Sequence, residues 1–160
     1  MTVLRWVNLV FAIAALLPPA AHVLELPNKL ALPGPLWLSI QQHLYRGWGP
    51  FLGGPAEIGA LLTTLPLLIL RRHDPPTRSA TLIAAVAFVG MLAAFFILNR
   101  PVNEAVSRLT SAALPPDWAD YRWQWEIGHA LAATLAVIGL VAVVRGWLIE
   151  RDQGAPKPRR

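Results

Sequence analysis

The chain contains no cysteine. Disulfide bonds, thiolate catalysis, iron–sulfur clusters and cysteine-bound zinc are therefore excluded. The sequence also lacks a glycine-rich phosphate loop, a Gly-x-Ser-x-Gly nucleophile elbow and a His-Glu-x-x-His zinc motif. Any chemistry must come from His, Glu, Asp, Arg, Lys and Tyr side chains.

Charged residues are scarce as well. They make up 14% of the chain, whereas hydrophobic residues make up 55%, and the mean hydropathy is +0.47. A soluble domain carries about one quarter charged residues. The hydrophobic excess lies in four segments, at about 3–26, 56–71, 79–98 and 125–149. This pattern predicts an all-α integral membrane four-helix bundle that forms a single domain over residues 1–150.

Two of these segments are open to other interpretations. In the second, the purely apolar part after residue 57 contains Pro66 and covers only about 20 Å, so it also fits a soluble core helix. The first resembles a signal peptide, but its apolar character continues to Leu26, which favours an uncleaved helix. Pro18 and Pro19 predict a kink one turn before His22.

The basic residues set the expected orientation. With four spans, most of them fall on the side of the two termini: Arg5, Arg71, Arg72, Arg78, Arg145, Arg151, Lys157, Arg159 and Arg160. The positive-inside rule then places both termini in the cytoplasm of a cell inner or plasma membrane. Residues 151–160 are expected to form a disordered basic tail. Because the basic residues flank spans, the expected partner is membrane lipid and not nucleic acid.

The connection from residue 27 to residue 55 lies on the outer side in this topology. Leu36, Trp37, Ile40, Leu44 and Trp48 recur there at helical spacing, opposite Ser39, Gln42 and Arg46. This spacing predicts a short amphipathic interfacial helix between the first and second spans, which can act as a lid.

Two His/Glu pairs indicate a candidate metal site. His22 and Glu25, like Glu126 and His129, are three residues apart at the outer ends of the first and fourth spans. Glu-x-x-His pairs on facing helices supply ligands in di-metal bundles, and Glu57 could add another ligand. Iron, copper, manganese or zinc would suit such a set. Chance spacing explains the pairs equally well, and the first pair has the reversed order.

The same residues also fit a site without a metal. Arg122 and Lys29 can hold an anionic or phenolate substrate while His22 or His129 accepts a proton. Alternatively, Glu25 with Lys29 and Arg122 with Glu126 are i,i+4 ion pairs of structural origin. Asn99 and Asn103 can add neutral hydrogen bonds, or they can cap the third helix where Pro101 is expected to end it.

Four residues are the predicted catalytic set, namely His22, Arg122, Glu126 and His129. The predicted substrate contacts are Lys29, Tyr45, Asn103, Trp118 and Trp125, although an interfacial aromatic belt would also explain the tryptophans.

Three segments of the chain look familiar: Asn99-Arg-Pro-Val-Asn103, Pro115-Pro-Asp-Trp118 and Arg122-Trp-Gln-Trp-Glu126 with His129. They resemble the signature of the anthrone-oxygenase-like family of small four-helix membrane proteins, many of which have no assigned function. The resemblance implies oxidation of a polycyclic phenolic anthrone to an anthraquinone by molecular oxygen, without an added cofactor. It also implies that His129 or His22 is the base, that Arg122 and Asn103 bind the oxyanion, and that tryptophans form the pocket walls.

Two further function classes stay open. One is a metal-dependent membrane oxidase that uses the His/Glu set, and the other is a non-enzymatic transporter or assembly subunit. Association of identical chains is expected through small residues at membrane-helix spacing in the third span: Ala84, Ala87, Gly90 and Ala94.

Overall fold

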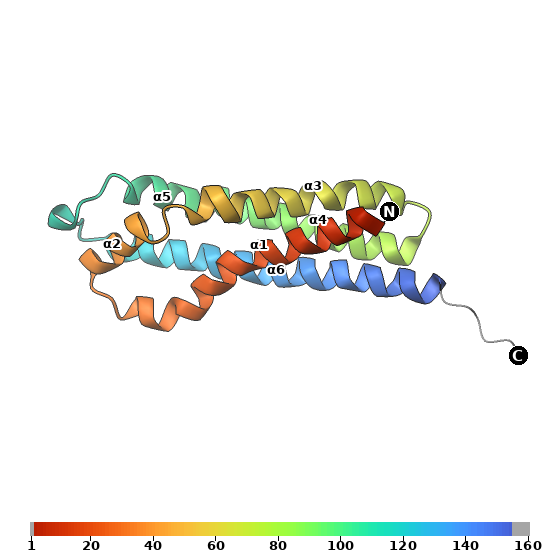
Figure 1. Ribbon diagram of the computed structural model, residues 1–160. Helices are drawn as coiled ribbons and strands as arrows, with labels where there is room; N and C mark the ends of the chain where they lie inside the picture. Colours follow the sequence, from red (N-terminus) through yellow and green to blue (C-terminus); the bar gives the residue numbers. More distant parts are fainter. Residues whose placement is uncertain (1, 155–160) are drawn as a thin grey trace, which may run out of the picture.

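Four long helices run side by side in the computed structural model, which describes residues 2–154 (Figure 1). The elements in chain order are α1 (Thr2–Leu30), α2 (Gly34–His43), the π-helical turn η1 (Gly49–Gly53), α3 (Gly54–Leu70), α4 (Pro75–Ala94), the π-helical turn η2 (Phe95–Asn99), α5 (Arg100–Val106), the 3₁₀ turn η3 (Ser111–Ala113) and α6 (Trp118–Gly154). The predicted all-α four-helix bundle is confirmed.

The bundle contains four helical stretches that are long and apolar enough to cross a membrane: Thr2–Leu30, Gly49–Leu70, Pro75–Val106 and Trp118–Gln153. The chain is therefore a multi-pass membrane protein with the four predicted spans. Each stretch is longer than its predicted segment. The second was predicted to be the shortest, and η1 adds a turn before α3 that brings this stretch to 22 residues.

The expected end of the third helix at Pro101 is wrong. Helix α4 passes through η2 into α5, which has Pro101 in its first turn. Proline lacks an N–H donor and its ring clashes with the carbonyl four residues earlier, so it disrupts a regular α-helix. The wider π turn changes this spacing, and proline is well tolerated at the start of the α-helix that follows. The same arrangement recurs where η1 precedes Pro55 of α3.

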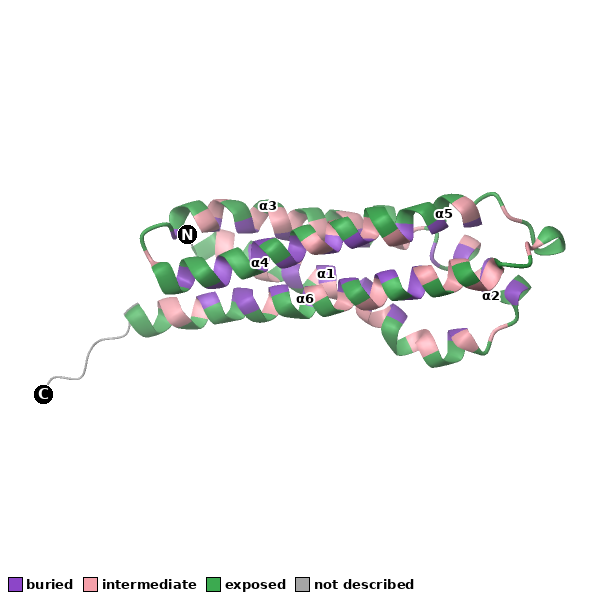
Figure 2. Ribbon diagram, turned by 180° about the vertical axis from the view of Figure 1, so that it is seen from behind, coloured by how far each residue is buried: buried purple, intermediate pink, exposed green. Residues whose placement is uncertain are grey.

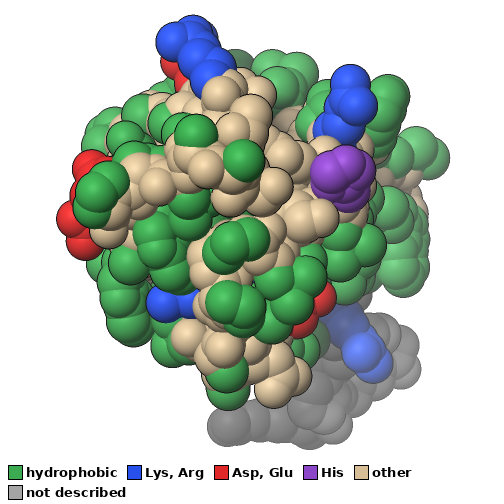
Figure 3. Space-filling view, turned by 90° about the vertical axis from the view of Figure 1, so that its left-hand side faces the viewer, with side chains coloured by type: hydrophobic (Ala, Val, Ile, Leu, Met, Phe, Trp, Pro, Cys, Tyr) green, Lys and Arg blue, Asp and Glu red, His purple; other side chains and the backbone are tan. Residues whose placement is uncertain are grey.

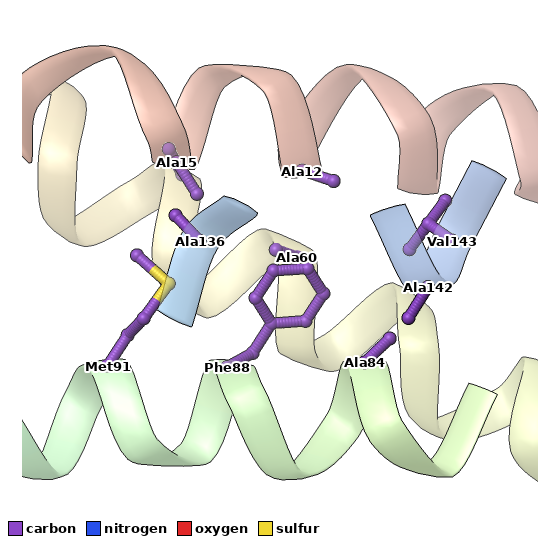
Figure 4. Packing of buried hydrophobic residues seen from close by; sticks show 10 residues of the cluster. Ala12, Ala15, Ala60, Ala84, Phe88, Met91, Ala136, Ala142 and Val143 are labelled. Carbon is purple, nitrogen blue, oxygen red and sulfur yellow. The ribbon is translucent and has the colours of Figure 1, made fainter. Parts of the chain in front are cut away.

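Small side chains form much of the core of the bundle. Ala12, Ala60, Ala84 and Ala136 are fully buried and let the helices approach around the ring of Phe88 (Figure 4). The buried residues face the bundle interior and the exposed residues face outward (Figure 2). Such an outward apolar surface is what lipid contact requires.

The small residues expected to mediate self-association are used within the chain. Ala84, Ala87 and Ala94 are almost completely buried, and the α-carbon of Gly90 faces the side chain of Leu135 on α6. Close packing of α4 against α6 therefore explains the small-residue spacing without a second copy.

The two ends of the bundle differ. The beginning of α1, the α3–α4 connection and the end of α6 lie at one end, and α2 and α5 lie at the other (Figure 1). Helix α1 leaves the bundle axis towards its carboxyl end in both ribbon views (Figures 1 and 2). Helix α6 continues to Gly154, so the first residues of the predicted disordered tail are helical, while 155–160 lie outside the described residues.

The predicted helix between the first two spans is present as α2, but its packing differs from the prediction. It ends at His43, and Leu36 and Leu44 of the expected apolar stripe are exposed. The side chain of Gln42, expected on the polar face, donates to the carbonyl oxygens of Val106 and Leu109, each at 2.9 Å. Helix α2 is thereby fastened to the carboxyl end of α5, whose last carbonyls lack helical partners.

Candidate functional site: a cavity with two histidines

A cavity of about 950 Å³ opens at the end of the bundle that carries α2 and α5. Its aromatic lining comprises Tyr45, Trp48, Phe95, Phe96 and Trp125, and its polar lining includes His22, Gln41, Glu57, Asn99, Asn103 and His129. Apolar side chains and backbone dominate the surface at this end, with few charges among them (Figure 3). A large, mostly apolar cavity with a few polar groups is typical of a small-molecule site.

Two histidines from distant parts of the chain meet in this cavity. The rings of His22 on α1 and His129 on α6 lie with centroids 4.3 Å apart and planes at 75°. Both lie beside the indole of Trp125, at 4.5 Å and 4.0 Å between ring centroids. The cavity therefore brings together one histidine from each of the two predicted His/Glu pairs.

Asn99 fixes the ring of His129. The Asn99 side-chain nitrogen donates to the carbonyl oxygen of Trp125 at 2.9 Å and lies 2.7 Å from His129 Nδ1. His129 Nδ1 is also 2.9 Å from the same carbonyl oxygen. Both contacts to the His129 ring use Nδ1, and Nε2 has no hydrogen-bond partner among the described residues. We refer to His22, Asn99 and His129 as the histidine cluster.

His22 is 2% exposed, and its Nδ1 has no hydrogen-bond partner among the described residues. The nearest carboxylate oxygen, Glu25 Oε2, is 3.6 Å away. A buried polar nitrogen without a partner is costly. Binding of a polar group from a ligand at this place would therefore be favourable.

Tyr45 holds Glu25 on the other side of His22. The phenol of Tyr45 donates to Glu25 Oε2 at 2.6 Å, and its ring stacks on Trp125 with centroids 5.8 Å apart. Burial, and then the hydrogen bond to Glu25, raises the pKa of the Tyr45 phenol above its ordinary value. Tyr45 therefore stays neutral and acts as a hydrogen-bond donor.

A second polar cluster lies next to the first but outside the cavity lining. Lys29 Nζ and Glu126 Oε2 form a buried ion pair at 2.8 Å between α1 and α6. Arg122 Nη1 donates to the carbonyl oxygens of Lys29 and Leu32 at 3.3 and 3.1 Å, and its guanidinium lies over Trp118. We refer to Lys29, Arg122 and Glu126 as the ion-paired cluster.

The expected ion pairs within each helix do not form. Glu25 binds Tyr45, and Glu126 pairs with Lys29 across the bundle. The reason is burial, since a charge inside the bundle needs a close partner and Lys29 supplies it for Glu126. The predicted catalytic residues Arg122 and Glu126 and the predicted substrate contacts Lys29 and Trp118 do not line the cavity.

The proposed five-residue metal set does not assemble. Within residues 2–154, no group of three or more His, Asp and Glu side chains is placed to hold a metal ion. Tyr45 and Lys29 occupy the carboxylates of Glu25 and Glu126, which leaves His22, His129 and the more distant Glu57.

Asn103 and Trp125 do lie where a substrate contact is expected. Asn103 Oδ1 accepts a hydrogen bond from Trp125 Nε1 at 2.9 Å. The side-chain amide nitrogen is therefore the polar atom of Asn103 that remains for a ligand. Both residues line the cavity. The Asn103 amide can therefore donate to a ligand oxygen.

Gln41, Phe95 and Phe96 are among the cavity residues that sequence analysis did not assign to a site. Gln41 is buried and its Nε2 has no partner among the described residues. Adjacent residues on a helix point about 100° apart, so Gln41 and Gln42 face different surroundings, and no sequence signal showed which of them would be buried. Phe95 and Phe96 lie in η2, and a π turn changes the face that each residue presents.

Comparisons with known proteins returned no matching family model, curated protein or solved structure.

Proposed function

We propose that the chain is a membrane oxygenase of the anthrone-oxygenase-like kind, acting with molecular oxygen on a hydrophobic phenolic or polycyclic molecule. The observation that carries this proposal is the paired arrangement of His22 and His129 in an aromatic cavity of about 950 Å³. Planar aromatic walls suit a planar ring system, and imidazole is the usual general base in proteins.

The proposed reaction begins at a methylene group that lies between two aromatic rings, opposite a ring ketone. In the proposed reactive tautomer of His129 the proton lies on Nδ1 and is donated to Trp125 O, so the Asn99 amide nitrogen, itself a donor, moves away from Nδ1. The Nε2 lone pair then accepts a proton from this carbon. The resulting enolate carries its negative charge on the former ketone oxygen. The amide nitrogen of Asn103 donates to that oxygen and stabilises the charge.

Oxygen then takes up the electrons of the substrate carbanion. A carbon–oxygen bond forms, the product is a hydroperoxide at the former methylene carbon, and the proton on the imidazole returns to the peroxide. Loss of water breaks the oxygen–oxygen bond and the remaining carbon–hydrogen bond, which leaves a second ketone. One oxygen molecule is consumed and one water is released, so atoms and electrons balance without a further oxidant.

Support for an outer-face site in a plasma or inner membrane comes from charge. The beginning of α1, the α3–α4 connection and the first turn of α4 lie at the end opposite to the cavity, and they carry Arg5, Arg71, Arg72 and Arg78 (Figure 1). The positive-inside rule assigns that end to the cytoplasm. Because the chain has no cysteine, single cysteines at Arg72 and at His43 can be labelled with an impermeant maleimide on intact cells. Labelling at position 43 alone supports this orientation, and labelling at position 72 alone reverses it.

Oxygen uptake by the purified protein in lipid nanodiscs, with anthrone as substrate, tests the activity. We expect uptake above that of empty nanodiscs, and a decrease in kcat of at least about 100-fold in His129→Leu. Glu104→Gln, on an exposed ion pair with Arg100, serves as the control and should retain the wild-type rate. Binding of anthrone without uptake above empty nanodiscs would exclude the oxygenase and favour a non-enzymatic binding protein.

A further inference from the structure

Glu57 is the cavity residue that the proposed reaction does not use. Its side chain lines the cavity from the first turn of α3. We propose that Glu57 anchors the ligand by accepting a hydrogen bond from a hydroxyl group on an aromatic ring, so that the site selects hydroxylated polycyclic molecules. This inference rests on the proposed function only in taking the cavity as the substrate site.

Every other glutamate in the described residues has a structural partner. Glu25 binds Tyr45, Glu104 binds Arg100, Glu126 binds Lys29, and Glu150 binds both Arg5 and Arg71. Among the glutamates of residues 2–154, Glu57 alone has a side chain that makes no hydrogen bond or ion pair. An ionisable side chain in a membrane-spanning helix that faces a cavity without a partner is typical of a functional site.

The position of Glu57 near the start of α3 does not explain why its carboxylate lies at the cavity without a partner. A carboxylate in the first turn of a helix is stabilised by N–H groups that have no helical acceptor. Here α3 continues directly from η1, and the N–H of Gly54 already donates to the carbonyl oxygen of Gly49. The first turn therefore offers Glu57 fewer free donors than an isolated helix start would.

Two buried polar atoms in the same cavity indicate a ligand independently of Glu57, which is itself only partly buried. His22 Nδ1 and Gln41 Nε2 have no hydrogen-bond partner among the described residues, and both side chains are at least nine-tenths buried. Gln41 presents an N–H donor, whereas Glu57 presents an acceptor. A ligand that satisfies both carries a hydrogen-bond acceptor and a hydroxyl group on one apolar body.

The aromatic lining selects the shape of that body. Trp48, Phe95 and Trp125 come from three different elements and present rings to the cavity. Fused aromatic rings offer the largest contact with such walls, and a second oxygen on the ring system would meet the donor of Gln41, since Asn103 binds the ketone oxygen. The class is therefore a planar polycyclic ketone with at least one ring hydroxyl.

The matched pair 2-hydroxyanthraquinone and 2-methoxyanthraquinone tests this inference. The full chain is placed in lipid nanodiscs, and binding is followed by quenching of tryptophan fluorescence at a pH where the hydroxyl group is neutral. The wild type should bind the hydroxy probe about 10- to 100-fold more tightly than the methoxy probe, because the methyl ether cannot donate to Glu57.

The variants show whether Glu57 is responsible. In Glu57→Leu the preference should fall to about 2-fold or less, with affinity for the methoxy probe retained or improved. Glu57→Gln, which keeps the shape and a neutral acceptor, should retain an intermediate preference. Glu104→Gln is the matched control and should keep the full preference, since its side chain is more than half exposed and outside the cavity.

The outcomes that overturn the inference are distinct from failure of the proposed activity. An unchanged preference in both Glu57 variants would remove Glu57 from ligand recognition. If an anthraquinone with a cationic aminomethyl group in place of the hydroxyl group bound more tightly than the hydroxy probe, Glu57 would be a cation-binding residue. Because these probes are already quinones, their binding is measured without turnover, and absent oxygen uptake with anthrone would refute the oxygenase alone.

Discussion

The two polar clusters at the cavity end of the bundle share a neighbour but differ in charge and in partners. Trp125 contacts both: the Lys29 ammonium lies 4.9 Å from its ring centroid, and His129 lies at 4.0 Å. In the ion-paired cluster each charged group binds an opposite charge or a carbonyl oxygen, although Glu126 Oε1 and Arg122 Nε have no hydrogen-bond partner among the described residues. In the histidine cluster the imidazole rings face the cavity, and His22 Nδ1 has no described partner.

The difference follows from the cost of burying charge. A buried ion must be paired before it can contribute to stability, so Lys29 and Glu126 bind each other and join α1 to α6. A neutral imidazole can be buried at lower cost, and its unused nitrogen remains available to a ligand. Lys29, Arg122 and Glu126 thus have a structural role in this region, whereas the histidine cluster and Glu57 face the cavity.

Breaking the ion pair should produce the largest loss of stability. In Lys29→Met the carboxylate of Glu126 stays buried without its cation, and we expect the free energy of unfolding to fall by about 3–5 kcal/mol. Reversible unfolding in mixed micelles measures this change. The double variant Lys29→Met/Glu126→Leu is the control and should recover most of the loss. If the single variant were as stable as wild type, the pair would not join the two helices.

A methyl group at Gly128 should damage the histidine cluster. A Cβ on Gly128 would overlap the side-chain amide of Asn99, which holds His129. Such overpacking costs about 1–3 kcal/mol, so Gly128→Ala should lower both stability and affinity for 2-hydroxyanthraquinone. Gly49→Ala, where no atom outside the local backbone lies within 4 Å of the added Cβ, is the control for the change in stability; because Gly49 lines the cavity, the affinity of Gly128→Ala is compared with that of the wild type. Equal results in both variants would contradict close packing of Asn99 against α6.

Much of the fold could be predicted because hydrophobic length is a property of the sequence. Four apolar segments and α2 were found from composition and helical spacing. The π turns were not, because proline at positions 55 and 101 predicts a break in the helix, and only the three-dimensional contacts show how the chain continues. The predicted second and third spans were therefore too short.

The candidate site was predicted in part. His22 and His129 could be chosen since each follows or begins an apolar span, and Asn103 and Trp125 lie in the expected region. Pairing across the bundle could not be predicted: the sequence places Arg122 and Lys29 at the same outer boundary as the histidines. Which of these side chains face the cavity depends on how each helix is rotated about its own axis. The apolar periodicity of the spans does not determine that rotation.

Tyr45 should give a smaller effect that depends on pH. Tyr45→Phe removes a hydrogen bond to the Glu25 carboxylate, which contributes about 1.5 kcal/mol. Because the pKa of the folded-state phenol is raised, its contribution is complete below pH ~10, the unfolded value, and is lost as pH rises towards the folded pKa. Between pH 8 and 12 the free energy of unfolding should therefore fall more steeply with pH in the wild type than in Tyr45→Phe. Parallel curves would mean that Tyr45 titrates normally.

The smallest change in stability is expected at His22, and it gives the sharpest contrast with Lys29. His22→Leu removes a buried nitrogen that lacks a partner, and this gain offsets the lost ring contacts with Tyr45 and Trp125. The free energy of unfolding should stay within about 1 kcal/mol of wild type, while affinity for 2-hydroxyanthraquinone falls.

A matched control for His22 lies further along α1. Asn8 is equally buried, but it donates to Ala60 O and to the hydroxyl oxygens of Thr63 and Thr64. Asn8→Leu should therefore lose about 1–3 kcal/mol, because these groups lose their partner. If His22→Leu cost as much as Asn8→Leu and left ligand affinity unchanged, the histidine cluster would be structural, and the contrast with the ion-paired cluster would be wrong.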